Sequence, residues 1–219
     1  MIFVIIITMF KALLDLIYKN KCLICSCSKT DSFLCKNCAK DVNFLSSFPH
    51  RIYNNIPIYS AATYENVVKK LIQLLKFSHK KSSSVVLGEL LFEYYKKLNL
   101  NRDFIIIYPN SFYLKKLFRG YEHMYLITKE FAKLSALKLY KDVIKKTRNT
   151  VSQYKAKNRR LNIENSFKIN EKYINELKSK PVLVVDDIIT TGATLEEIIN
   201  VLKKEDIKDI TCLTISKAV

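Results

Sequence analysis

The stretch VLVVDDIITTGATL, residues 182–195, decides the fold. Four apolar β-forming residues lead to Asp186 and Asp187, and a turn around Gly192 then runs into a pattern typical of a helix. A buried strand followed by a tight turn and a helix is the repeating unit of α/β proteins with a parallel sheet. The turn also predicts an anion site, because backbone N–H groups, threonine hydroxyls and the positive end of a helix converge there.

The carboxylates of Asp186 and Asp187 indicate which chemical groups lie beside the bound anion. They would repel a phosphate, so we expect them to face sugar hydroxyls or a divalent cation, and a ribose 5-phosphate group satisfies both halves of the site. The alternative is that Asp186 or Asp187 caps the helix or pairs with a lysine. The stretch has one glycine and fits neither a Walker A loop nor a dinucleotide fingerprint. The predicted ribose-phosphate residues are Asp186, Asp187, Thr190, Thr191, Gly192, Ala193 and Thr194.

Alternating helical and strand patterns precede and follow this stretch. Helices are predicted at residues 64–77, 84–98, 121–139 and 193–202, and buried strands at 104–108, 182–185 and 207–215. The serines before residue 84 are candidate N-caps. The third helix is expected to turn Leu126, Ile127, Phe131, Leu134 and Leu137 inward. The basic stretch 115–160 and the polar stretch 165–180 are expected to be rich in loops.

Four of the six cysteines form two closely spaced pairs near the N-terminus. Cys22, Cys25, Cys35 and Cys38 make two C-x2-C pairs, and four thiolates in this arrangement fill the tetrahedral shell of a structural zinc ion. Cys27 could replace Cys25 as a ligand, and the four thiols could instead form a disulfide pair or stay unliganded. Cys212 lies far away in an apolar run and is expected to be a buried core thiol.

The charge of the chain predicts a polyanionic partner. Lys and Arg number 37 against 20 Asp and Glu, which leaves a net charge of +17. A nucleotide-composition bias in the genome is the alternative source of the many lysines. The hydrophobic fraction of 49%, with 3 glycines and 4 prolines, excludes collagen-like and largely disordered chains.

The apolar residues 1–10 (MIFVIIITMF) are too few to cross a bilayer, which needs about 20. Positive charge follows this run instead of preceding it, unlike a secretory signal. We therefore expect no transmembrane segment and a cytoplasmic protein. Contact between the N-terminus and the inner face of the membrane is the alternative, and the functional chain could also begin at Met9.

The basic middle of the chain predicts a platform for single-stranded DNA. Between residues 111 and 160, Lys and Arg far outnumber acids and aromatic residues are interleaved with them. Cations can follow a phosphate backbone while bases stack on aromatic faces. The basic residues could instead form a solvated charged face, and the aromatic residues could belong to the core. The predicted nucleic-acid residues are Tyr154, Lys155, Lys157, Arg159 and Arg160, with Tyr113 as a further stacking candidate.

Several motifs in one order resemble the ComF family of competence proteins, in particular its ComFC branch. They are the cysteine pairs, YENVVKKLIQLLKF at 64–77, the R-G-Y run at 119–121, R-x-T-x-x-Q at 148–153, RRLNIENSF at 159–167 and D-D-x-x-T-T-G-A-T at 186–194. The last is similar to the phosphoribosyl pyrophosphate (PRPP) motif of type I phosphoribosyltransferases. The resemblance implies a type I phosphoribosyltransferase-like parallel sheet flanked by helices at 51–219, and an N-terminal helix with a zinc module at 1–50.

The resemblance also implies further pocket residues and a function. The pocket candidates are Arg119, Gly120, Arg148 and Gln153. The implied function is DNA uptake in natural transformation, with single-stranded DNA, a PRPP-type ligand and a helicase or other uptake proteins as partners. An active phosphoribosyltransferase that uses PRPP and Mg²⁺ is the alternative.

Two departures from the family pattern favour binding over catalysis. The R-G pair is followed by Tyr121, Glu122 and His123 in place of the usual [FY]-N-Q, and the proline-rich segment of the pyrophosphate side is reduced to residues 108–110 (YPN). For His123 we expect a surface or hydrogen-bonded histidine, with a general acid or base as the alternative.

Overall fold

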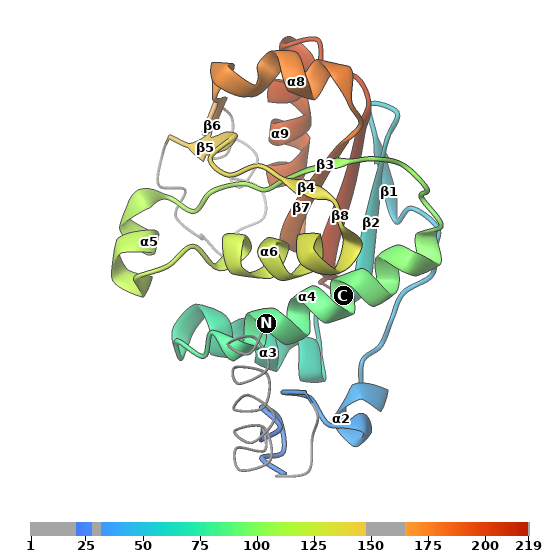
Figure 1. Cartoon of the computed structure of the whole chain (residues 1–219), viewed down its shortest axis with the longest axis vertical. Helices are drawn as coiled ribbons and strands as arrows, with labels where there is room; N and C mark the ends of the chain where they lie inside the picture. Colours follow the sequence, from blue (N-terminus) through green and yellow to red (C-terminus); the bar gives the residue numbers. More distant parts are fainter. Residues whose placement is uncertain (1–20, 28–31, 148–164, 219) are drawn as a thin grey trace, which may run out of the picture.

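The computed structural model describes residues 21–27, 32–147 and 165–218. A six-stranded sheet in the order β1-β2-β8-β7-β3-β4 lies at its centre (Figure 1). The strands are β1 (Arg51–Tyr53), β2 (Ile56–Thr63), β3 (Ile105–Ile107), β4 (Lys138–Leu139), β7 (Val182–Ile189) and β8 (Ile210–Lys217). All neighbouring pairs are parallel except β1 and β2, which are antiparallel. The predicted α/β class with a mostly parallel sheet is confirmed.

Helices cover both faces of this sheet. They are α3 (Asn66–Phe77), α4 (Ser82–Leu98) and α6 (His123–Ser135) on one face, and α8 (Ile174–Ser179) and α9 (Ala193–Lys204) on the other. Leu183 and Val185 of β7 belong to the first apolar layer, whereas Val182 and Val184 belong to the second. Because both faces of the strand are buried, its sequence is apolar without alternation.

Shorter elements complete the described chain. They are α2 (Lys36–Lys40), α5 (Tyr113–Arg119), η2 (Glu171–Tyr173) and the antiparallel pair β5 (Ile144–Lys146) and β6 (Phe167–Ile169). The expectation that 115–160 and 165–180 would be rich in loops is therefore wrong for much of their described length. Tertiary burial sustains β6 and α8, since Phe167 and Leu177 are buried in the layer that contains α9.

Three details of the helices differ from the sequence prediction. The helix expected to reach residue 139 ends at Ser135, because Ala136 adopts a left-handed φ of 56° and the chain then forms β4 beside β3. Leu134, expected to face inward, is 37% exposed. The predicted serine caps are also wrong, since Lys81 occupies the N-cap of α4 and the Ser84 hydroxyl donates back to the Lys81 carbonyl.

The parallel strands direct two loops to the same edge of the sheet. Residues 108–112 follow β3 and residues 190–192 follow β7, and β3 pairs directly with β7. Ligands in open α/β sheets bind at this carboxyl edge.

Among the described residues, no helix combines the length and apolar character that crossing a membrane requires. The apolar run 1–10 lies outside the described residues.

Candidate functional site

A cavity of about 280 Å³ opens at the carboxyl ends of β3 and β7. It is lined by residues 109–112 and 186–195, together with Lys76, Arg119, His123, Met124, Lys146 and Phe167. All seven predicted ribose-phosphate residues are among them. The structure thus brings together residues from α3, α5, α6, β5, β6 and the turn after β7.

The turn at the start of α9 leaves a helix N-terminus open to this cavity. Gly192 is the N-cap residue of α9, with a left-handed φ of 83° and no side-chain hydrogen bond that caps the helix. The Ala193 N–H lies 3.4 Å from the Thr191 hydroxyl, which is a long contact. Backbone N–H groups and the positive end of the helix dipole are therefore available to an anion.

Arg51 contacts both the turn and the first turn of α9. Its Nη1 donates to the Thr191 carbonyl at 2.5 Å, and its guanidinium forms an ion pair with the buried carboxylate of Glu196 in the first turn of α9. A Cβ atom at Gly192 would lie 2.6 Å from the Arg51 Nη1. Sequence reasoning missed Arg51, which is 140 residues from Thr191 and carries no local motif.

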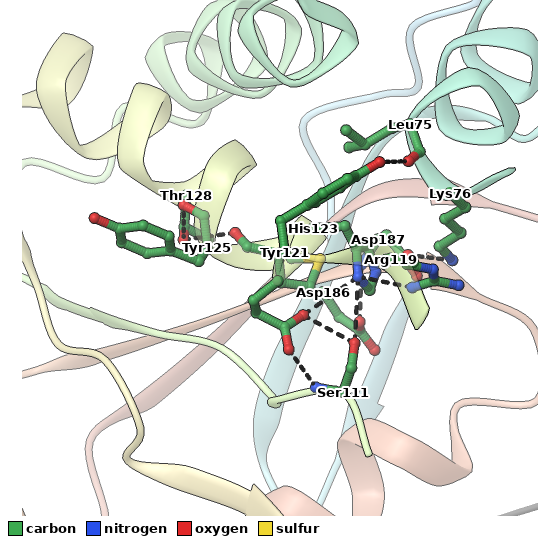
Figure 2. Close-up of polar contacts among 12 residues, drawn as sticks. Leu75, Lys76, Ser111, Arg119, Tyr121, His123, Tyr125, Thr128, Asp186 and Asp187 are labelled. Carbon is green, nitrogen blue, oxygen red and sulfur yellow. Dashed lines mark hydrogen bonds and ion pairs between the residues drawn. The ribbon is translucent and has the colours of Figure 1, made fainter. Parts of the chain in front are cut away.

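The two acids at the end of β7 have different surroundings. Asp187 is buried and forms an ion pair with Lys76 of α3, while His123 Nε2 lies 2.9 Å from the same Oδ2 atom (Figure 2). Burial opposes ionisation, but Lys76 and His123 hold the pKa of Asp187 well below its ordinary value. Burial and the neighbouring Asp187 charge raise the pKa of Asp186 to about 7.

His123 links this acid pair to the loop after β3. Its Nδ1 lies 3.3 Å from Glu122 Oε1, and Ser111 holds Glu122 by donating from its N–H at 2.9 Å and from its hydroxyl at 2.8 Å (Figure 2). Burial lowers the pKa of His123, but the hydrogen bonds with Asp187 and Glu122 outweigh it and raise the pKa above 6.5. His123 is thus the hydrogen-bonded histidine that the sequence favours.

The remaining predicted pocket and nucleic-acid residues divide into three groups. Arg119 lines the cavity, with Nη1 3.2 Å from His123 Nδ1. Gly120 adjoins it but does not line it. The rest lie outside the described residues: Arg148, Gln153, Tyr154, Lys155, Lys157, Arg159 and Arg160. Of the alternative roles for the acids, pairing with a lysine is observed for Asp187, and neither acid caps α9.

Sequence reasoning missed Lys76 and Ser111. Lys76 lies within the quoted run 64–77, but its neighbours give no sign that its ammonium turns toward β7. The signal that was available is the position of Lys76 directly after Leu75, which is fully buried. A lysine at such a position must extend its ammonium away from the apolar face of α3. Ser111 carries no signal in the sequence.

The four-cysteine cluster lies at the other end of the described chain, by α2 and near α3 (Figure 1). The sulfurs of Cys22, Cys25, Cys35 and Cys38 are all within 4.8 Å of one another, and the Cys25 and Cys35 sulfurs are 3.7 Å apart. Sulfurs around a tetrahedral zinc at about 2.3 Å are spaced about 3.8 Å apart. The cluster could therefore hold a metal ion, and Cys27 is not part of it.

Backbone donors support the cluster. The Cys35 N–H points to Cys22 Sγ at 3.5 Å and the Cys38 N–H to Cys35 Sγ at 3.4 Å. Such contacts orient and stabilise thiolates around a metal. Cys212 is fully buried among apolar residues of the sheet, as predicted.

Comparisons with known proteins agree with this geometry. Residues 129–218 match the phosphoribosyl transferase domain family. The chain is 31% identical over 102 residues to competence protein F of Haemophilus influenzae, covering 46% of this chain and 44% of that protein. It is 24% identical over 194 residues to DNA utilization protein YhgH of Escherichia coli K12, covering 83% of each chain. A 53-residue segment, 23% of this chain, is 43% identical to hypoxanthine/guanine phosphoribosyltransferase of Methanococcus maripaludis, covering 29% of that protein.

These matches, the α/β fold and the cysteine cluster point to one family. Together they support a protein similar to the ComF family, with a phosphoribosyltransferase-like domain.

Proposed function

We propose that this protein is an accessory protein of DNA uptake that binds single-stranded DNA and a ligand containing ribose 5-phosphate. The observation that carries the proposal is its similarity to competence protein F and DNA utilization protein YhgH. The open helix N-terminus at Gly192, with the acids 186 and 187 across the same cavity, supports the ribose-phosphate part. A helicase or another uptake protein is the partner that such a role requires.

Helix α5 supports the nucleic-acid part. It exposes Tyr113 by 65%, Leu117 by 71% and Phe118 by 83%. Its ends adjoin the cavity, because Phe112, directly before it, and Arg119, its last residue, both line that cavity. Exposed aromatic rings within a strongly basic chain offer stacking surfaces for unpaired bases. The basic segment 154–160, which the sequence singles out for the same role, extends this proposal.

The loop after β3 supports binding over group transfer. Two of its backbone donors are already used within the chain, since the Asn110 N–H donates to the Ile144 carbonyl at 3.0 Å and the Ser111 N–H to Glu122 Oε2 at 2.9 Å. The Glu122 carboxylate would also repel a pyrophosphate placed at this loop. Transferase activity with PRPP is the second candidate, supported by the short match to hypoxanthine/guanine phosphoribosyltransferase and by the seven residues around the cavity.

We also propose that the four-cysteine cluster holds a structural zinc ion and that residues 1–50 form a module in front of the domain at 51–219. Four thiolates leave no open coordination position for catalysis. Cys22, Cys38 and Val42 share the apolar cluster of α3 and α4, so the metal would join the N-terminal segment to the helical layer of the domain.

Fluorescence anisotropy with a labelled single-stranded oligonucleotide over a series of salt concentrations tests the DNA proposal. We expect weak sequence preference and a steep salt dependence. Neutralising Lys155, Lys157, Arg159 and Arg160 together should lower the slope of log K against log salt by about 0.7 for each lost contact. As a matched control, neutralising the exposed lysines Lys69, Lys70, Lys96 and Lys97 should leave affinity nearly unchanged. Absence of DNA binding at low salt, with nucleotide formation from PRPP and a base, would establish the transferase instead.

A further inference from the structure

The Asp187 carboxylate of the acid pair already has a lysine and a histidine as partners. Lys76 Nζ forms an ion pair with Asp187 Oδ2, and His123 Nε2 lies 2.9 Å from the same oxygen (Figure 2). The exposed fraction of the side chain is 17% for Lys76, 10% for His123 and 11% for Asp187. Ion pairs with this little solvent are only weakly screened.

Each of the two cations is held in place by the packing of its helix. Lys76 is in the last turn of α3, whose residues Leu71, Ile72 and Leu75 are buried in the apolar layer against the sheet. Directly before Lys76, the carbonyl of Leu75 accepts a hydrogen bond from the Tyr121 hydroxyl (Figure 2). The backbone from which the Lys76 side chain extends is therefore held in place.

The second cation is fixed from its other ring nitrogen. His123 is the first residue of α6, and its Nδ1 contacts Glu122, which Ser111 holds with two hydrogen bonds. Glu122 and Asp187 on opposite sides of the ring both favour its protonated form. Arg119 borders the other side of the ring, with Nη1 3.2 Å from His123 Nδ1.

A divalent cation does not fit this arrangement. Mg²⁺ is bound mainly through carboxylates, water and the oxygens of its substrate. Here the Asp187 oxygen carries the Lys76 ammonium and the His123 ring, and Mg²⁺ at that carboxylate would have to displace or face both positive groups. The positive charge that Mg²⁺ would bring to the acid pair is thus supplied by the protein.

We infer that Lys76 and His123 take the place of a divalent cation at the acid pair, so that the cavity binds a ribose 5-phosphate group without Mg²⁺. The inference rests on the proposed ribose-phosphate ligand. The phosphate lies at the turn that starts α9, and the ribose hydroxyls lie toward Asp186 and Asp187. Lys76 lessens the repulsion between the acids and the phosphate, and Lys76 is a specificity-determining residue for metal-free binding.

Calorimetric titration of ribose 5-phosphate into the full chain, in EDTA and in millimolar MgCl2, tests this inference. The wild type should bind with the same affinity in both buffers. Lys76→Met, which keeps the stem and removes the ammonium, should weaken binding in EDTA by about tenfold or more. MgCl2 should then restore part of that loss, a rescue that a merely structural lysine would not show. Lys76→Arg should keep metal-free binding.

The matched control is Lys69→Met, the same change at an exposed position of α3, which should leave binding unchanged in both buffers. Wild-type affinity that rises tenfold or more on adding MgCl2 would overturn the inference, even if Lys76→Met fails to fold. Unchanged binding by folded Lys76→Met in EDTA would also overturn it. Absence of ribose 5-phosphate binding by the wild type in both buffers would instead overturn the proposed ligand, and this inference with it.

Discussion

Replacing Gly192 with alanine tests how tightly the turn before α9 is built. Gly192 has φ of 83°, and an L-residue in the left-handed region costs about 1–2 kcal/mol. The added Cβ would also lie 2.6 Å from Arg51 Nη1 and 3.3 Å from Arg51 Cζ. The guanidinium would then have to move away from the Thr191 carbonyl and the buried Glu196 carboxylate.

The loss of the Arg51 contacts adds to the backbone strain. A hydrogen bond to a charged group contributes about 1.5–3 kcal/mol, and we reduce this figure because the Arg51 side chain is 33% exposed. We therefore expect Gly192→Ala to lower the free energy of unfolding by about 2–4 kcal/mol. Urea denaturation followed by circular dichroism measures this change.

Gly120 provides a matched control within the same chain. It also has a positive φ, of 70°, but nothing lies within 4 Å of the position of its Cβ. Gly120→Ala should therefore cost only the backbone strain, about 1–2 kcal/mol. In an Arg51→Ala background the excess cost of Gly192→Ala should disappear, since the clash and the contacts are gone. Equal losses for the two glycine variants in the wild-type background would refute this reasoning.

Three further predictions follow from the other parts of the molecule. Elemental analysis should find about one zinc per chain, retained in Cys27→Ser and released in Cys22→Ser, and a metal-free wild type would exclude the structural zinc. Tyr113→Ala and Phe118→Ala should each weaken binding of single-stranded DNA by about 1–3 kcal/mol in anisotropy titrations without changing the salt slope, whereas unaltered affinity would remove α5 from the DNA surface. The pKa of His123 in the folded state is raised above 6.5, so its stabilising charge is present below pH 6.5 and is lost as the pH rises through the folded pKa. The difference in unfolding free energy between the wild type and His123→Gln should therefore shrink as the pH is raised. A difference that stays constant with pH would rule out the ionised histidine.

The main strand, turn and helix of the site could be predicted from the sequence because their signals are local. An apolar run buried on both faces, followed by small hydroxylated residues and Gly192, specifies β7, the turn and α9 over 23 consecutive residues from Val182 to Lys204. The cysteine pairs are equally local, and the structure places all four sulfurs together.

Lys76 and Arg51 could not be predicted as site residues because they come from segments distant from β7 and the turn. Lys76 reaches Asp187 only after α3 has packed on the sheet, and Arg51 reaches the turn from β1, across 140 residues. Neither side chain differs in its local pattern from the many solvent-exposed cations of this basic chain. The short strands β4, β5 and β6 escaped prediction for a related reason, since two or three residues carry too little periodicity.

Titration of ribose 5-phosphate, with ribose as the comparison ligand, tests the central claim that the turn at residues 190–194 is a phosphate site. We predict that the wild type binds ribose 5-phosphate saturably and shows no measurable binding of ribose. Thr191→Val should bind ribose 5-phosphate more weakly, because the backbone donors of α9 and the threonine hydroxyls act on the phosphate. If ribose 5-phosphate bound no better than ribose, or if Thr191→Val and the wild type bound it equally, the claim would be contradicted.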